Sequence, residues 1–317
     1  MDAANFLINA SSFVITYIST RKLLPLFKKK VADIPNHRSS HIKNTPRGLG
    51  IVFSVISTTF CLLNGFNQIL FCLPLSLVGF ADDLWKVPAK YRYIAQLLIG
   101  ILIIQESPLN EYLSNNSNFY LEKFIFLLII LIFTGVVNFI NFMDGIDGLI
   151  TGSFIFIISG AILILNMQIA PLLFALLAFL FFNWSPAKSF MGDSGSLFLG
   201  GVYGYILLQC KNLEELAALL LIASPLLIDA FSCLVRRFIN NENIFAGHKK
   251  HLYQRLNQAG WKHSKISFFY IGFILLELIS YLTLGITLQI FTTFFIIIIG
   301  CYLDINIAIK FKSKLTH

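Results

Sequence analysis

The sequence predicts an all-α polytopic membrane protein. Of its 317 residues, 56% are hydrophobic and 13% are charged, and the mean hydropathy is +0.76. Soluble domains carry about 25% charged residues, so this composition excludes an ordinary soluble fold. Apolar runs recur along the whole chain, each near the roughly 20 residues that a spanning helix needs. Because membrane helices share one bundle, we expect a single integral-membrane domain over residues 1–317.

The apolar runs predict 10–11 transmembrane helices. The eleven runs lie at about 5–22, 48–63, 68–81, 93–105, 123–138, 149–165, 169–182, 195–210, 213–235, 267–285 and 287–303. The fourth and seventh runs are the weakest as full crossings because they are short. No Lys or Arg precedes the first run, so we do not expect a cleaved signal peptide.

Lysine and arginine residues predict the orientation. If the N-terminus lies outside, 22 of the 24 Lys and Arg residues fall in inward segments, and only Lys123 and Lys211 remain outside. Such an asymmetry is the usual mark of cytoplasmic loops. It therefore places the C-terminus in the cytoplasm. The net charge of +8 then reflects basic loops that face an anionic leaflet, and the dispersed basic residues do not favour nucleic-acid binding.

Four polar segments fall on the predicted cytoplasmic face. They contain the pair Asp82-Asp83, the segment 138–148, the segment 183–196 and the segment 247–256. The orientation used only Lys and Arg, so the shared location of the aspartates supports it independently. Carboxylates close to a bilayer are costly, which makes such segments candidate functional sites.

Each polar segment also has a purely structural interpretation. Asp82 and Asp83 could form a solvated helix end that pairs with Lys86 one turn away. Residues 138–148 could be a loop with Asx turns, and Asp193 or Ser194 could cap a helix. Phe190 could stack on a base or pack at the interface, and the segment around His248 could be a basic membrane-facing loop. The five cysteines lie in or beside apolar runs, and His and Cys do not gather at the spacing typical of zinc sites.

Taken together, the four segments favour phosphoryl transfer. They supply five aspartates, two histidines and several cations to one membrane face. Carboxylates bind Mg²⁺, and Mg²⁺ together with cationic side chains binds phosphates. A helix N-terminus, as expected near Asp193, also binds phosphate. We therefore expect transfer between a water-soluble phosphate ester and a component of the bilayer.

The ordered motifs resemble the polyprenyl-phosphate N-acetylhexosamine-1-phosphate transferase family, whose members include MraY and WecA. The resemblance spans about residues 33–260. The matching motifs are Asp82-Asp83-x-x-Lys86, Asn138-x-x-Asn141-x-x-Asp144-Gly-x-Asp147-Gly-Leu149, Asn183-x-x-Pro186-Ala187-x-x-Phe190-Met-Gly-Asp193-x-Gly195-Ser196 and His248-Lys-Lys-His251-Leu-Tyr-Gln-Arg255. The stretch Asp33-Ile-Pro-Asn36-x-Arg38-Ser-Ser-His41 with Thr45-Pro46-Arg47-Gly48 resembles the WbpL-like branch, which starts O-antigen synthesis. Leu49 departs from the glycine-richer turn of that branch.

The resemblance implies a reaction and a location. Undecaprenyl phosphate, or another polyprenyl phosphate, attacks the β-phosphate of a UDP-N-acetylamino sugar, and UMP leaves. Peptidoglycan or teichoic-acid type synthesis by the same chemistry is the alternative. The resemblance also implies Mg²⁺, with Mn²⁺ as a substitute, a bacterial inner-membrane enzyme whose active site faces the cytoplasm, and, by analogy, a homodimer.

The resemblance also implies roles for single residues. Asp193 would bind the metal, Asp82 and Asp83 would position or deprotonate the lipid phosphate, and Asp144 and Asp147 would shape the nucleotide side. Phe190 would stack on uracil. The remaining implied contacts to substrate or loops are those of Lys86, Asn138, Asn141, Asn183, His248, His251 and Arg255.

Two other classes compete with this interpretation. A transporter should carry ionisable residues near mid-bilayer, yet only Asp229 and Glu277 lie inside predicted spans, and Asp229 is near the cytoplasmic end. We expect Asp229 to be structural or to support a neighbouring site residue. The CDP-alcohol phosphotransferases also use Asp-Gly-rich motifs, but their long signature is absent from this sequence.

Overall fold

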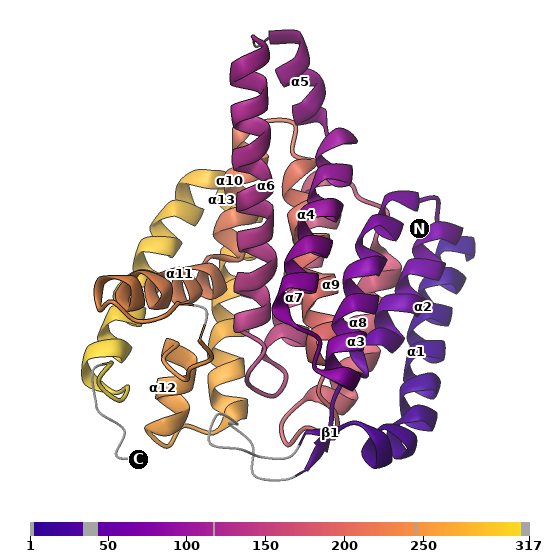
Figure 1. Ribbon diagram of the computed structural model, residues 1–317, viewed down its shortest axis with the longest axis vertical. Helices are drawn as coiled ribbons and strands as arrows, with labels where there is room; N and C mark the ends of the chain where they lie inside the picture. Colours follow the sequence, from indigo (N-terminus) through magenta and orange to yellow (C-terminus); the bar gives the residue numbers. More distant parts are fainter. Residues whose placement is uncertain (1–2, 34–43, 117, 245, 312–317) are drawn as a thin grey trace.

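The helices follow the predicted apolar runs in order. The computed structural model describes residues 3–33, 44–116, 118–244 and 246–311. Its elements are α1 (Ala3–Lys30), β1 (Ala32–Asp33), β2 (Thr45–Pro46), α2 (Gly50–Leu63), the 3₁₀ helix η1 (Asn67–Cys72), α3 (Leu73–Trp85), α4 (Ala89–Gln105), α5 (Pro108–Asn116), α6 (Phe119–Phe142), α7 (Leu149–Leu165), α8 (Ala170–Asn183), α9 (Gly192–Leu208), α10 (Leu213–Ile222), α11 (Ser224–Ile239), α12 (Leu252–Gln258) and α13 (His263–Asn306). Most of the helices stand side by side in one bundle (Figure 1).

The helices confirm an all-α polytopic membrane protein. Among the described residues, three stretches are long and apolar enough to cross a membrane: Asn67–Trp85, α6 and α13. The pair α10 and α11 would add a fourth, and α2, α7 and α8 are shorter apolar helices. The number of 10–11 crossings and the orientation of the termini remain predictions.

Helix α13 contains two of the predicted spans. Its backbone leaves helical geometry at Leu284 and Gly285. Thr293 donates a hydrogen bond to Glu277 at 2.7 Å, and the hydroxyls of Ser280 and Thr292 lie 2.8 Å apart. A straight helix rises 1.5 Å per residue, which would keep these residues far apart. The two halves of α13 therefore fold back on each other, as expected for runs 267–285 and 287–303.

The predicted run 213–235 is broken. It forms α10 and α11, which meet at Ala223 and bend by 77°. Pro225 lies in the first turn of α11, where its missing N–H costs no helical hydrogen bond. As a result, α11 lies across the direction of α6 (Figure 1), and its last turn contains Arg236 and Arg237.

Helix α9 lies at the centre of the bundle and is almost completely buried. It packs against α2, α3 and α6. A Cβ atom on Gly79 of α3 would lie 2.3 Å from the carbonyl oxygen of Asp193, and one on Gly50 of α2 would lie 2.5 Å from the Cα of Gly195. Small residues allow such close helix contacts in membranes. The first turn of α9 is thereby held between neighbouring helices.

A small two-stranded sheet was not expected from the sequence. Strands β1 and β2 pair antiparallel, with Ala32 opposite Pro46 and Asp33 opposite Thr45. Phe190 donates its backbone N–H to the carbonyl of Pro46 at 2.8 Å, which attaches this sheet to the segment before α9. The branch motif residues Pro35, Asn36, Arg38 and His41 lie outside the described residues.

Candidate active site

The four polar segments meet at one end of the bundle. The end of α3, the α6–α7 connection, the α8–α9 connection and α12 all lie at the lower end in Figure 1, whereas α5 lies at the opposite end. The structure thus brings together segments that are far apart in sequence. Their side chains form an aspartate cluster around the first turn of α9 and a separate group around α12.

Asp83 anchors the start of α9. Its carboxylate accepts the backbone N–H groups of Asp193 and Ser194, both at 3.1 Å. The side chain is fully buried, and a guanidinium nitrogen of Arg47 lies 2.6 Å from it. A Cβ atom on Gly192 would lie 2.3 Å from Asp83 Oδ2, so glycine is required there. A carboxylate on exposed N–H groups at a helix N-terminus is favourable, because those groups carry partial positive charge.

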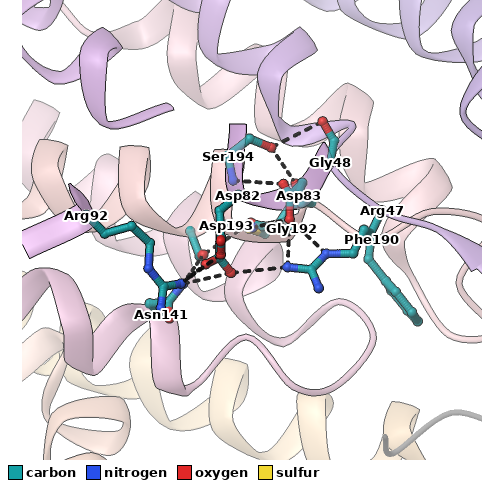
Figure 2. Close-up of polar contacts among 12 residues, drawn as sticks. Arg47, Gly48, Asp82, Asp83, Arg92, Asn141, Phe190, Gly192, Asp193 and Ser194 are labelled. Carbon is teal, nitrogen blue, oxygen red and sulfur yellow. Dashed lines mark hydrogen bonds and ion pairs between the residues drawn. The ribbon is translucent and has the colours of Figure 1, made fainter. Parts of the chain in front are cut away.

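Asp82 and Asp193 face each other across an arginine. One guanidinium nitrogen of Arg92 lies 3.1 Å from Asp82 and also pairs with Asp193 (Figure 2). Arg47 lies 3.4 Å from Asp193 on the other side. Neither arginine had been assigned a role from the sequence. Arg92 lies in the first turns of α4, and the left-handed turn at Lys86 brings that helix back over the end of α3.

Lys86 does not take the place expected for it. It is exposed and has φ 51° at the end of α3. Over the described ranges it forms no salt bridge. The two arginines, rather than Lys86, pair with the aspartates. For the role of Arg92 as a partner of the aspartates, the sequence offered only one sign, a positive charge near the start of the helix that follows Asp82 and Asp83.

Of the three predicted asparagines, only Asn141 contacts the aspartate cluster. Its amide donates to Asp193 at 3.3 Å and to Ser196 at 2.8 Å. Asn138, one turn deeper, donates to Gln96 at 2.8 Å and so joins α6 to α4. Asn183 is buried, accepts the hydroxyl of Thr151 at 2.6 Å and donates to a backbone carbonyl. Asn138 and Asn183 therefore hold structural elements together.

The pKa of Asp144 depends on its burial and on the charges of the cluster. Burial raises the pKa of Asp144 to about 8, and the negative charges of Asp193, Asp83 and Asp147 act in the same direction. The positive charge of Arg47 offsets only part of this effect. Asp82, Asp83 and Asp193 together face only two guanidinium groups, and Asp144 adds a further negative charge once the pH rises above about 8. A divalent cation would compensate the surplus of negative charge, and carboxylate and amide oxygens are the ligands that Mg²⁺ prefers.

Asp147 joins three segments of the chain. Its carboxylate accepts the backbone N–H of Ala187 at 3.1 Å and pairs with His263 of α13 at 3.1 Å. Burial alone would raise the pKa of Asp147, but the hydrogen bond and the charge of His263 hold it below its usual range. The backbone carbonyl of Asp147 accepts the hydroxyl of Ser267 at 2.7 Å. The structure places Asp147 against the chain itself, and no sequence signal had indicated His263.

Phe190 lies beside Arg47 at the edge of the cluster. Its half-buried ring extends from the segment before α9 on the side away from Arg92 (Figure 2). Arg47 therefore lies between this ring and the aspartates. A base stacked on the ring would place its phosphates near Arg47, a geometry compatible with the expected role.

The histidine motif lies around the start of α12. His251 precedes α12 and is 3% exposed, and His248 is half-buried. Burial and nearby positive groups lower the pKa of His248 to about 3. Burial alone would lower the pKa of His251, but the negative charge of nearby Asp229 outweighs it and raises that pKa to about 9. Asp229 accepts the N–H groups of Leu252 and Tyr253 at 2.7 and 3.1 Å, which agrees with the structural role expected for it.

Arg255 is enclosed by the chain. It is 5% exposed, pairs with Asp304 and donates to the carbonyls of Lys250 at 3.1 Å and Ile309 at 3.0 Å. Its guanidinium is therefore engaged within the fold. Tyr253 connects the motif to the central loop, because its hydroxyl donates to the carbonyl of Phe142 at 2.9 Å.

The fold and the site define an all-α membrane protein with an aspartate and arginine cluster at one end. The model of Glycosyl transferase family 4 matches residues 65–211. The chain is 29% identical to the probable undecaprenyl-phosphate N-acetylglucosaminyl 1-phosphate transferase of Bacillus subtilis, over 90% of this chain and 88% of that protein. It is 30% identical to the phospho-N-acetylmuramoyl-pentapeptide-transferase of Orientia tsutsugamushi, over 85% of this chain and 90% of that protein. The corresponding protein of Campylobacter jejuni serotype O:6 is 31% identical, over 70% of this chain and 76% of that protein.

These similarities establish the family. The chain belongs to the polyprenyl-phosphate hexosamine-1-phosphate transferase family, as its motifs had indicated. It is therefore a membrane-bound phosphotransferase.

Proposed function

We propose that the protein transfers an N-acetylamino-sugar 1-phosphate from a UDP-sugar to undecaprenyl phosphate and releases UMP. An oxygen of the lipid phosphate attacks the phosphorus that bears the sugar. The bond between that phosphorus and the oxygen leading to the nucleoside phosphate breaks, and UMP leaves with that oxygen. The observation that carries the proposal is the cluster of Asp82, Asp193 and Arg92 at the first turn of α9.

The cluster supports this chemistry because phosphoryl transfer depends mainly on positioning and charge neutralisation. Asp82 and Asp193 would hold Mg²⁺ or Mn²⁺, with Asn141 beside them. When bound, the ion would neutralise phosphate oxygens. Arg47 and Arg92 add fixed positive charge next to the same oxygens. Asp83 is occupied by the amides of α9, so its role in the site is to hold that helix.

The sugar donor is proposed from the relatives and from the motifs. A relative in Bacillus subtilis is named for N-acetylglucosaminyl 1-phosphate transfer, which supports a UDP-N-acetylamino sugar. The motif around Arg47 supports a role in O-antigen or lipopolysaccharide synthesis at the bacterial inner membrane. The basic loops support a cytoplasmic active site. Relatives named for pentapeptide transfer make peptidoglycan synthesis the competing assignment.

A transferase assay tests the proposal. Purified protein in detergent would receive undecaprenyl phosphate, Mg²⁺ and one UDP-sugar at a time, and UMP release would be followed. The panel would contain UDP-N-acetylglucosamine, UDP-linked 6-deoxy-N-acetylamino sugars and the UDP-muramoyl-pentapeptide. We expect lipid-dependent release with an N-acetylamino sugar and none with the pentapeptide donor. Turnover of the pentapeptide donor alone would overturn the proposed pathway but not the reaction.

Two variants test the metal assignment. Asp193→Asn should lose turnover, and chelation with EDTA should abolish it in the unmodified protein. Glu122→Gln is the matched control, because Glu122 lies at the opposite end of α6, where it pairs with Lys123. Full turnover in Asp193→Asn would contradict the metal assignment. Lipid-independent uptake of a UDP-sugar into vesicles, without UMP release, would instead favour a transporter.

A further inference from the structure

A second group of metal-ligating side chains lies where α11 meets the loop before α12. Cys233, His248 and His251 each offer one ligand atom, and these atoms lie within 4.8 Å of one another. Cys233 and His251 are both 3% exposed, whereas His248 is half-buried and leaves a route from solvent. Their spacing along the chain is not typical of a zinc site, and no zinc site was expected here, yet the fold brings the three side chains together. Sequence spacing could not reveal the group, because the loop after α11 turns back toward Cys233.

A carboxylate faces one of the two histidines. His251 Nδ1 lies 3.7 Å from Asp229 Oδ1. Within the described part of the chain, this nitrogen has no hydrogen-bond partner. Asp229 is itself fixed by Tyr270, whose hydroxyl donates to it at 2.7 Å. A carboxylate that faces one ring nitrogen keeps the proton there and leaves the lone pair on the other nitrogen, as in the carboxylate–histidine–metal arrangement.

The second histidine also offers a lone pair. His248 Nδ1 accepts the backbone N–H of Lys250 at 3.2 Å, a long hydrogen bond that a metal could replace. The two imidazole rings lie with their centres 4.9 Å apart and their planes tilted by 32°. Small rotations of the two rings would therefore bring both toward one ion with the sulfur of Cys233.

We propose that Cys233, His248 and His251 bind a divalent cation of the Zn²⁺ class, at a site distinct from the aspartate cluster. Thiolate and imidazole ligands favour Zn²⁺, whereas the carboxylates of the aspartate cluster favour Mg²⁺. Three protein ligands leave a fourth position for water, as in open zinc sites. On binding, the thiol of Cys233 and the imidazolium of His251 each lose one proton to solvent, and the thiolate and the freed ring nitrogen bond to the metal.

The site would fasten the histidine loop to α11. That loop connects α11 to α12, and Tyr253 of α12 contacts the central loop that carries Asp144. A bound cation would also hold both histidines, so they could not contact a substrate phosphate at the same time. With the metal bound, the loop between α11 and α12 would be held rigidly against α11.

Cobalt absorption tests the site directly. The full chain in detergent would be titrated with Co²⁺, whose thiolate complexes show a sulfur-to-metal charge-transfer band and whose tetrahedral complexes show strong visible bands. We expect one equivalent of Co²⁺ to produce both signals, and Zn²⁺ to remove them. A large excess of Mg²⁺ should leave them unchanged. No charge-transfer band in the unmodified protein would overturn the proposal.

Variants separate the site from other cysteines and from the aspartate cluster. Cys233→Ala should abolish the charge-transfer band, and His248→Gln, at a half-buried position, should weaken Co²⁺ binding at least about tenfold. Cys210→Ala is the matched control and should retain the band, because Cys210 lies just beyond the C-terminal end of α9 and is not one of the three grouped residues. An unchanged band in Cys233→Ala would mean an adventitious ion only. Asp193→Asn should also retain the band, so failure of the transferase assignment would not affect this result.

Discussion

The carboxylate of Asp83 accepts the backbone N–H of Asp193 at 3.1 Å, so the end of α3 fixes the first turn of α9. Its neighbour Asp82 instead faces Arg92, at 3.1 Å. Two adjacent residues of one helix therefore have different tasks. The carboxylate of Asp83 is occupied by backbone N–H groups of α9. The carboxylate of Asp82 instead lies at the proposed site of the cation and the phosphate.

Substitutions of the two aspartates should separate these tasks. Asp83→Ala removes the buried partner of a partly buried ion pair with Arg47, and the loss of one partner of a fully buried pair typically costs about 3–5 kcal/mol of unfolding free energy, an upper bound for this variant. Asp82→Ala should cost clearly less, because Asp82 is partly exposed. Thermal unfolding in detergent would measure both effects. Equal stability of the two variants would contradict the structural role of Asp83.

Arg92 should compete with a divalent cation. Its guanidinium now bridges Asp82 and Asp193, the position where the proposed metal would bind. Removal of this charge in Arg92→Gln should therefore tighten Mn²⁺ binding, by about tenfold for each 1.4 kcal/mol of lost repulsion. Electron paramagnetic resonance of free Mn²⁺ would measure the affinity without any substrate.

Lys90→Gln controls for the general effect of charge. Lys90 lies on the same helix, is exposed and stacks over the ring of Tyr91. The Lys90→Gln variant should bind Mn²⁺ with nearly the same affinity as the unmodified protein. Weaker binding in Arg92→Gln would show that Arg92 supports the metal site rather than competing with it.

The sequence was sufficient for the aspartate cluster but not for its counter-ions. Asp82, Asp193 and Asn141 could be placed together because motif order and topology put them on one membrane face. The partner of Asp82 depends on the left-handed turn at Lys86, which no periodic pattern encodes. Arginine has no preferred spacing relative to a carboxylate in another helix, so Arg92 could not be identified.

Other polar residues look alike in sequence but serve the fold. Asn183 and Arg255 fall within functional motifs, yet both are bound to other parts of the chain. Buried polar groups need partners, and only the tertiary structure shows whether those partners come from the chain or from a ligand. The break at Ala223 was missed for a related reason: the apolar run continues through it, and Pro225 is equally compatible with a kinked span.

Asp144 should make the metal-free protein sensitive to alkaline pH. Its pKa is raised to about 8, so the folded state favours the neutral acid. The stability that this provides is complete below the ordinary pKa of 3.8 and is lost as the pH rises through about 8. In the presence of EDTA, the melting temperature of the unmodified protein should fall between pH 6 and pH 9 relative to that of Asp144→Asn, in which the group cannot ionise. A constant difference between the two proteins over this range would contradict the raised pKa.

Gly145 and Tyr253 should depend on each other. A Cβ atom on Gly145 would lie 2.3 Å from the hydroxyl oxygen of Tyr253, which is completely buried and hydrogen-bonded to Phe142. Gly145→Ala must therefore displace either α12 or the loop that carries Asp144. We expect a lower melting temperature and a loss of transferase activity, because small displacements of catalytic groups have large effects on rate.

The double variant tests whether the two residues are coupled. Tyr253→Phe removes the hydroxyl and should cost roughly 1 kcal/mol for the lost hydrogen bond. In that background, Gly145→Ala should be less harmful than in the unmodified protein, because part of the space is free. A double-mutant cycle on melting temperature and on UMP release measures this coupling. Strictly additive effects would mean that α12, which carries Tyr253, does not position the loop that carries Asp144, and that each can be altered without consequence for the other.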